Sequence, residues 1–153
     1  MAENSFRPLK GDWITKEYTL KVSAGAVEVG DMMMVTSGGV TVELGTNAAT
    51  ALVGISKETL ANVAATQTIR IKTRKIKTSC TFVGAVTDGV LAVGDTDTLR
   101  GCDLEDHEGV DVDTDTHHML VIVKGRVATA DGATTAGEAE FKFAQLPEDI
   151  SAF

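Results

Sequence analysis

The sequence predicts an all-β fold: a small β-barrel, β-tulip-like or β-sandwich domain built from a faint internal repeat, with an extended N-terminal arm. Two observations carry this prediction. Apolar residues alternate with polar ones along much of the chain, and turn-forming dipeptides separate the alternating segments. A period of two is that of a strand with one buried face, and short strands between regular turns are typical of sandwiches and barrels.

The alternating segments are distributed over most of the 153 residues. They are Val27 and Val29; Val40, Val42 and Leu44; Ile69 and Ile71; Phe141 and Phe143. Turn dipeptides at 38–39, 88–89, 108–109 and 131–132 fall between them, and such glycine-containing pairs mark turns. A chain of this length is about one domain.

The internal repeat has halves at about 24–77 and 88–143. The V-G-D sequence at 29–31 recurs at 93–95, and we interpret it as a corner in which glycine supplies unusual backbone angles. We expect the halves to interleave in one barrel over 19–146, because two separate domains of about 65 residues would have thin cores. Residues 1–18 are then an arm and 147–153 a tail.

Three consecutive methionines follow the first V-G-D corner: Met32, Met33 and Met34. In a strand, the first and third share one face and the second takes the other, so both faces of this strand are apolar. One interpretation is a central strand that is covered on both sides. The other is that one face packs against another subunit, because methionine adapts to irregular surfaces.

The segment 103–118, DLEDHEGVDVDTDTHH, gathers acidic residues and histidines and invites a metal. An EF-hand beginning at Asp111 is excluded, since its sixth position needs glycine and holds Thr116, and its twelfth needs glutamate and holds Ile122. We expect a solvated acidic loop. The alternatives left open are another calcium site, or a zinc site of His117 with a carboxylate.

Motifs of enzyme chemistry are missing from the sequence. It has no G-x-S-x-G, no G-x-x-x-x-G-K-[ST] and no G-x-G-x-x-G, the signatures of a nucleophile elbow and of phosphate loops. We therefore expect a protein that is not an enzyme and has no catalytic residues, cofactor or metal. Cys80 and Cys102 are read as small buried hydrophobes, with a disulfide as the alternative.

The net charge of −8 argues against nucleic acid and anionic membranes as partners. The basic exception is RIKTRKIK, which contains Arg70, Lys72, Arg74, Lys75 and Lys77. These residues form either a solvated edge that blocks unwanted strand pairing or a contact stripe for an acidic protein surface. The longest apolar run, residues 119–123, is far shorter than the ~20 residues of a transmembrane helix, and we expect synthesis in a cytoplasm.

The N-terminal segment carries apolar side chains that need to be buried somewhere: Phe6, Leu9, Trp13, Ile14 and Tyr18. Pro8 and Gly11 disfavour a helix or a central strand there. We interpret residues 1–18 as a binding arm that is loose in the free protein, so that deletion of residues 1–15 would leave the melting temperature nearly unchanged. Packing of the segment onto the chain's own barrel is the alternative.

The pattern VSAGAVEVGDMMMVTSGGVTVE, with ALVGISKETLANVAATQTIRIKT, resembles the small capsid decoration, or cement, proteins of tailed bacteriophages. The matching positions are Gly25, Val27, Val29, Gly30, Gly39, Val40, Gly54 and Ile71. The likeness covers most of residues 20–100, with a fainter echo to about 143. The acidic insertion and the aromatic N-terminal segment depart from the family pattern.

This resemblance implies a structural protein on the outer surface of a virion head, made in a bacterial host. Its partners would be the major capsid protein and copies of itself, as a homotrimer that stabilises contacts between capsid subunits. The candidate interface residues are then the N-terminal apolar residues, the methionines and the basic stripe. The alternative function is a ligand- or calcium-binding β-sandwich module that uses segment 103–118, for which calcium-dependent stabilisation would be diagnostic.

Overall fold

The computed structural model describes residues 5–21, 25–36, 41–49, 51–61, 67–74, 80–94, 100–129 and 136–144. Within these ranges the chain forms strands and turns and no helix, which confirms the all-β prediction. The strands are β1 (Phe6–Lys10), β2 (Trp13–Leu20), β3 (Met32–Val35), β4 (Val42–Leu44), β5 (Leu52–Ser56), β6 (Gln67–Arg74), β7 (Thr81–Asp88), β8 (Gly101–Asp106), β9 (Gly109–Asp111), β10 (Leu120–Val127) and β11 (Gly137–Phe143).

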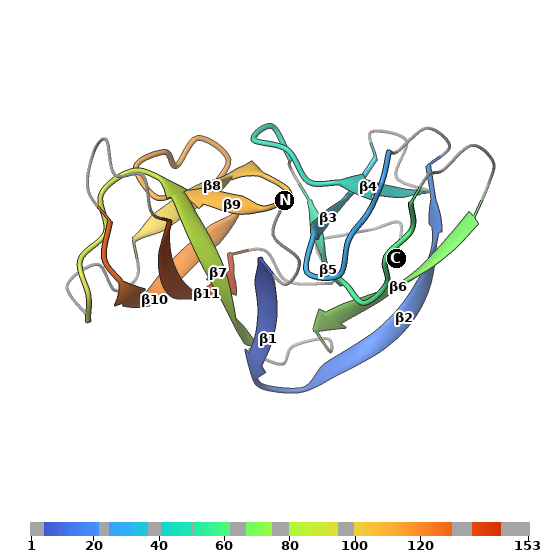
Figure 1. Ribbon diagram of the computed structural model, residues 1–153, viewed down its shortest axis with the longest axis horizontal. Coiled ribbons are helices and arrows are strands. Elements are labelled where there is room, and N and C mark those ends of the chain that lie inside the picture. Colours follow the sequence, from blue (N-terminus) through green and yellow to red (C-terminus); the bar gives the residue numbers. More distant parts are fainter. Residues whose placement is uncertain are drawn as a thin grey trace.

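The strands form two units that lie side by side (Figure 1). Strands β2-β4-β3-β5-β6 close into one barrel, which we call the first barrel. The other strands form a sheet in the order β1-β7-β11-β10-β8-β9, and a further β7–β9 pairing closes the run from β7 to β9 into a ring, the second barrel. Strand β1 lies outside this ring, on β7.

The two barrels have the same connectivity. In each, the first strand pairs antiparallel with the fifth (β2 with β6, β7 with β11) and parallel with the third (β2 with β4, β7 with β9). The structure thus contains a repeat, but the interleaved single barrel was the wrong arrangement. The proposed halves at 24–77 and 88–143 each began one strand too late, because the first strands, β2 and β7, carry none of the shared glycine turns.

The recurring V-G-D sequence marks equivalent corners. Gly30 and Gly94 have φ angles of 93° and 97°, which favour glycine because a Cβ would crowd the backbone. The Gly30 N–H donates to the Ser56 carbonyl in β5, and the Gly94 N–H donates to the Gly125 carbonyl in β10. Each corner therefore leads the chain into its barrel beside the fourth strand.

A shared core explains how two small barrels are stable. The interior of the first barrel contains Met33 and Ile69 among others, whereas Met32 belongs to a larger cluster made mostly by the second barrel. Met34 is partly buried against that same larger cluster. The methionine strand is thus covered on both faces, and the second barrel of the same chain supplies one of the covers.

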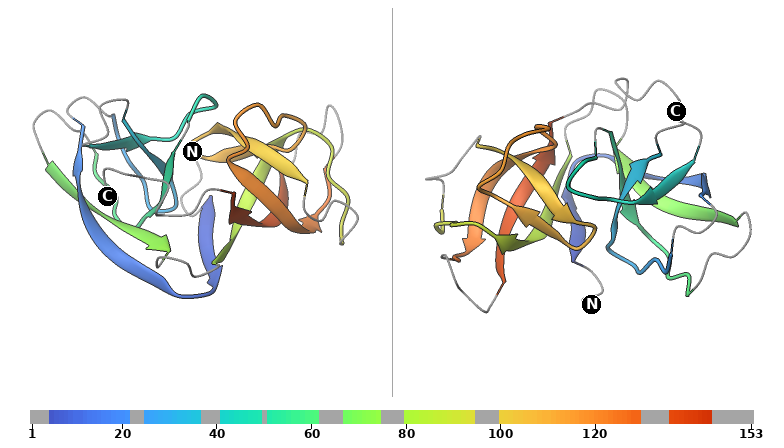
Figure 2. Two further views of the ribbon diagram at one scale, coloured as in Figure 1. Left: turned by 180° about the vertical axis from the view of Figure 1, so that it is seen from behind. Right: turned by 90° about the horizontal axis from the view of Figure 1, so that it is seen from above.

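The N-terminal segment is extended, as predicted, but residues 6–20 are paired strands rather than a separate arm. Strand β1 pairs with β7 from Phe6↔Gly84 to Lys10↔Thr81, and β2 pairs with β6 along its whole length. Figure 2 shows the ribbon of β1 and β2 crossing from the second barrel to the first. Pro8 is tolerated because β1 is the outermost strand of its sheet.

Aromatic rings hold this ribbon in place. The ring centroid of Phe82 lies 5.9 Å from that of Phe6, 6.4 Å from that of Trp13 and 4.8 Å from that of Phe143. The Trp13 indole N–H also donates to the Lys10 carbonyl at 2.9 Å. The apolar area of the N-terminal segment is therefore buried largely within its own chain, as the alternative interpretation expected.

Candidate functional site

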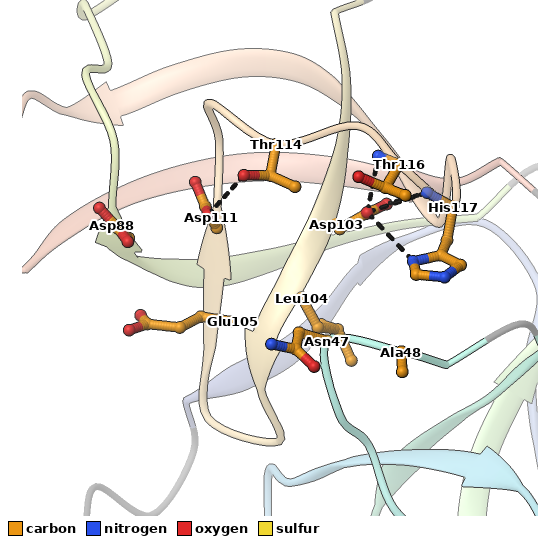
Figure 3. A pocket seen from close by; sticks show the side chains of 10 residues that line it. All are labelled: Asn47, Ala48, Asp88, Asp103, Leu104, Glu105, Asp111, Thr114, Thr116 and His117. Carbon is orange, nitrogen blue, oxygen red and sulfur yellow. Dashed lines mark hydrogen bonds and ion pairs between the residues drawn. The ribbon is translucent and has the colours of Figure 1, made fainter.

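The acidic segment borders a cavity of about 500 Å³ between the second barrel and the loop at Asn47 and Ala48 of the first (Figure 3). The lining side chains come from β7, β8, β9 and the loop that follows β9. Four of them are carboxylates, and one is an imidazole: Asp88, Asp103, Glu105, Asp111 and His117. The alternative ligand- or metal-binding interpretation of the acidic segment would place its site in this cavity.

Asp103 is the buried member of this group, with 1% of its surface exposed. Its carboxylate accepts hydrogen bonds from the backbone N–H groups of Thr116 at 2.8 Å and His117 at 2.9 Å. The Nδ1 atom of His117 lies 3.4 Å from the same carboxylate. Asp103 therefore holds the loop before β10 in place, and its oxygens are already occupied.

Two further aspartates of the segment stabilise their own turns, and Glu105 bonds to the neighbouring strand β7. Asp111 accepts from the backbone N–H of Asp113 at 3.0 Å and from the Thr114 hydroxyl at 2.7 Å. Asp106 accepts from the Glu108 N–H at 2.8 Å, and Glu105 accepts from the Thr87 hydroxyl. Aspartate commonly stabilises turns by such local bonds, so the cavity wall is organised by its own hydrogen bonds.

A different trio has the geometry of a metal site, the only one found among the described residues. One ligand atom each of Asp31, His107 and Glu108 lies within 4.8 Å of the others. Asp31 stands in the first V-G-D corner, and the other two form the turn between β8 and β9. The Nε2 atom of His107 is 2.9 Å from a Glu108 carboxylate oxygen. Imidazole with carboxylates suits zinc and related divalent ions.

The tertiary structure brings this trio together at the junction of the two barrels. The Met32 N–H donates to the His107 carbonyl at 2.9 Å, so the β8–β9 turn is docked against the start of β3. The Asp31 carboxylate accepts from the Glu28 N–H at 2.8 Å, within its own corner. No sequence signal pointed to Asp31 as a site residue, because its partners are distant in the chain.

The pKa of the Asp31 carboxyl is raised from 3.8 to about 6, chiefly because burial penalises its charged form. The Glu28 N–H and His107 lower it, and the carboxylates of Glu108 and Glu28 raise it. The folded protein therefore binds this proton more readily than the unfolded chain. The resulting stability is complete below pH 3.8 and is lost as the pH rises through about 6.

Replacement of Asp31 by asparagine is expected to remove this pH dependence while preserving the acceptor for the Glu28 N–H. Urea unfolding at pH 5 and pH 8 is the measurement. Going from pH 8 to pH 5 should favour the folded wild type over the folded variant by about 1 kcal/mol. Equal pH dependence in the two proteins would show that Asp31 does not titrate in this range.

The predicted interface residues have different fates in the structure. Phe6, Tyr18, Met32 and Met33 are core residues with at most 7% of their surface exposed, so as placed they have no surface for a partner. Trp13 and Met34 are partly buried. Leu9 and Ile14 are 42% and 37% exposed, and they remain candidates for a partner contact.

The basic stripe is only partly described. The guanidinium of Arg70 pairs with the Glu58 carboxylate at 2.8 Å, and Lys72 lines a cavity of about 270 Å³ with Phe6 and Ile55. The side chain of Arg74, and Lys75 and Lys77, lie outside the described residues. Three further apolar side chains are exposed and were not predicted from the sequence: Val90, Val93 and Val127.

The possible nucleophiles have structural partners. The Ser56 hydroxyl donates to the Glu58 carbonyl at 2.7 Å, and the Cys80 thiol donates to the Asp12 carbonyl at 3.2 Å. Cys80 and Cys102 are free and buried. Burial raises the pKa of the Cys102 thiol, whereas a reactive cysteine needs a lowered one.

The fold and its site define an all-β protein of two barrels with a carboxylate–histidine cluster at their junction. The chain matches no protein-family model, and neither a curated protein nor a solved structure matches it. The residues that the structure describes include no helix capable of crossing a membrane.

Proposed function

We propose that this chain is a structural protein that binds the outer surface of a bacteriophage head and stabilises contacts between major capsid proteins. The sequence resemblance supports the class, through its turn glycines and alternating valines. The observation that carries the proposal is the β1–β2 ribbon, which joins both barrels and presents apolar side chains to solvent. Its partners would be the major capsid protein and further copies of the chain, as a trimer on the virion.

The architecture suits a protein that clamps other subunits. One apolar cluster includes Met32, Leu52 and Ile55 of the first barrel together with Phe82 and Leu104 of the second, which favours one rigid body. A clamp transmits force between the surfaces it joins, so the two barrels must not move apart under load. Asp103, Asp106 and Asp111 of the acidic segment are engaged by the backbone of its own loops and turns, which favours this function over a ligand site in the cavity.

The experiment is sedimentation of purified protein with heads from a phage strain that lacks the gene for this chain. We expect wild type to bind, and Leu9→Asp to bind at least about tenfold more weakly, because burial of a leucine is worth about 1.5 to 3 kcal/mol. Val127→Asp is the matched control, since Val127 is 47% exposed against 42% for Leu9 and lies in β10, which pairs with β11 and β8 and not with β1 or β2.

The outcomes separate the function from the placement of its surface. Heads that fail to bind wild type would refute the proposed function. Binding that is lost in Val127→Asp and retained in Leu9→Asp would keep the function and move the contact surface to the far end of the second barrel. Circular dichroism of each variant checks that the β-sheet content is unchanged.

A further inference from the structure

The two barrels differ at one strand edge. In the second barrel, one edge of β7 pairs first with β1, at Thr81–Gly84, and then with β9, from Val86 onward. The opposite edge of β7 pairs with β11. Strand β7 therefore has paired neighbours on both edges along most of its length.

The equivalent edge of the first barrel lacks the counterpart of β1. Leu20 of β2 pairs with Val42 of β4 as Val86 of β7 pairs with Val110 of β9. By this match, Thr15–Glu17 corresponds to the part of β7 that β1 covers. Among the residues that the structure describes, β6 is the one strand paired with β2 at these positions, and it occupies the other edge.

Hydrogen bonds establish which backbone groups face the open edge. The backbone carbonyl of Arg70 in β6 accepts from the Lys57 N–H, and the Arg70 N–H donates to the Glu58 carboxylate. Both backbone groups of Arg70 therefore point away from its cross-strand partner Glu17. In an antiparallel pair the partner of such a residue also faces outward. Thr15 lies two residues before Glu17, so its backbone groups point toward the same edge of β2. Lys21 lies four residues after Glu17, and its N–H donates to the Val42 carbonyl, which shows that this edge is the β4 side.

Thr15 and Glu17 thus direct N–H and C=O groups toward an edge that no described strand covers. Both residues are exposed, as is Lys16 between them. An exposed edge of this kind is a template for another strand, and proteins use it for peptide recognition by strand addition. Figure 1 shows β2 at the margin of the first barrel, where β6 runs beside it and crosses it.

We propose that the β2 edge at Thr15–Glu17 binds an extended segment of the capsid subunit, which adds to the sheet antiparallel to β2 as β1 adds to β7. This inference rests on the proposed function. The segment would carry an acidic residue opposite Lys16, because opposite charges on directly facing positions are favourable.

Two other occupants fit less well. A second copy could pair its own β2 antiparallel to this edge, with Thr15 of each chain opposite Glu17 of the other. That register would set Lys16 against Lys16, and like charges that face each other are destabilising. Strand β1 of another copy is already bound to its own β7, with Phe6 1% exposed. Release of β1 would expose that aromatic side chain to water.

The test uses proline to remove one outward-facing N–H at a time. Thr15→Pro and Glu17→Pro each delete a donor on the open edge and leave the ladder to β6 intact, since proline is tolerated on edge strands. Each variant should bind phage heads at least about tenfold more weakly, because a backbone hydrogen bond is lost and the ring occupies its place. Thr15→Ala and Glu17→Ala remove the same side chains but keep the N–H.

Hydrogen exchange with mass spectrometry provides an independent readout on unmodified protein. The peptide that contains Thr15 and Glu17 should gain protection of about two amides when wild type binds heads. Unchanged exchange there, or proline variants that bind as well as the alanine variants, would overturn the inference while leaving the proposed function standing.

The remaining outcomes are also decisive. Wild type that binds no heads would overturn both proposals. Native mass measurement covers the case of self-association: a wild-type dimer that Thr15→Pro converts to monomer would show that the edge binds a second copy instead of the capsid subunit. If Thr15→Pro is unfolded, Glu17→Pro and the exchange measurement still decide the question.

Discussion

Deletion of residues 1–15 is expected to prevent stable folding, with loss of the cooperative unfolding transition or aggregation. The deletion removes β1 and the first residues of β2. It would expose the edge of β7 and leave a void where Phe6 and Trp13 pack against Phe82. This expectation reverses the one drawn from the sequence, which treated these residues as a separable arm.

A point substitution at Phe6 measures the main contribution of β1 to the stability of the fold. Phe6 is 1% exposed, and an added Cβ on Gly84 would lie 2.7 Å from its ring, so the ring packs directly on the β7 backbone. Phe6→Ala should lower the free energy of unfolding by about 3 to 5 kcal/mol, the usual cost of truncating a buried phenylalanine. Denaturant unfolding measures this loss.

Leu9→Ala is the control on the same strand, because Leu9 is 42% exposed. Substitutions of exposed residues usually change stability by about 0.5 kcal/mol or less. Equal midpoints for Phe6→Ala and Leu9→Ala would mean that β1 detaches freely, and the arm interpretation would then be restored.

Gly54→Ala is expected to destabilise the first barrel by about 3 kcal/mol or more, at the upper end of overpacking costs. An added Cβ at this position would lie 2.1 Å from the Lys72 carbonyl oxygen. That oxygen belongs to the backbone of β6, which pairs with β5 at this point. A backbone group cannot rotate away like a side chain, so the two strands must separate.

Gly94→Ala is the control for Gly54→Ala. Gly94 has a φ of 97° and no atom within 4 Å of an added Cβ, so its replacement tests backbone strain without a clash. That strain is worth about 1 to 2 kcal/mol. Thermal and urea unfolding of both variants give the comparison. A smaller loss for Gly54→Ala than for Gly94→Ala would show that β5 and β6 are less closely packed than the structure has them.

Much of the fold could be predicted from the sequence. Alternation at residues 42–44, 69–71 and 141–143 marked parts of strands, and the two V-G-D sequences were recognised as equivalent corners. These features follow from local physics. A strand with one solvent-exposed face needs alternating apolar and polar residues, and a positive φ favours glycine. The N-terminal segment was misassigned because Pro8 and Gly11 disfavour a helix or a central strand. An outermost strand tolerates Pro8, and Gly11 lies in the turn between β1 and β2 with a φ of 95°.

The candidate sites depend on contacts that local patterns do not encode. Asp31 meets His107 and Glu108 only because the β8–β9 turn docks on the first corner, across about half of the chain. Met32 and Met33 are the same residue type, so no pattern within the triplet predicts which barrel packs against each face of the strand. The acidic segment attracted attention by composition, yet three of its aspartates, Asp103, Asp106 and Asp111, stabilise its own loops and turns.

The sequence by itself determined that this chain is all β, where its corners lie and that it repeats. Only the tertiary structure decided that each half closes its own barrel and that the halves share an apolar cluster. It also decided that β1 covers the edge of β7, while no described strand covers the matching edge of β2. The physical reason is that alternation specifies which face of a strand is buried, whereas strand pairing is made by backbone groups that every residue carries.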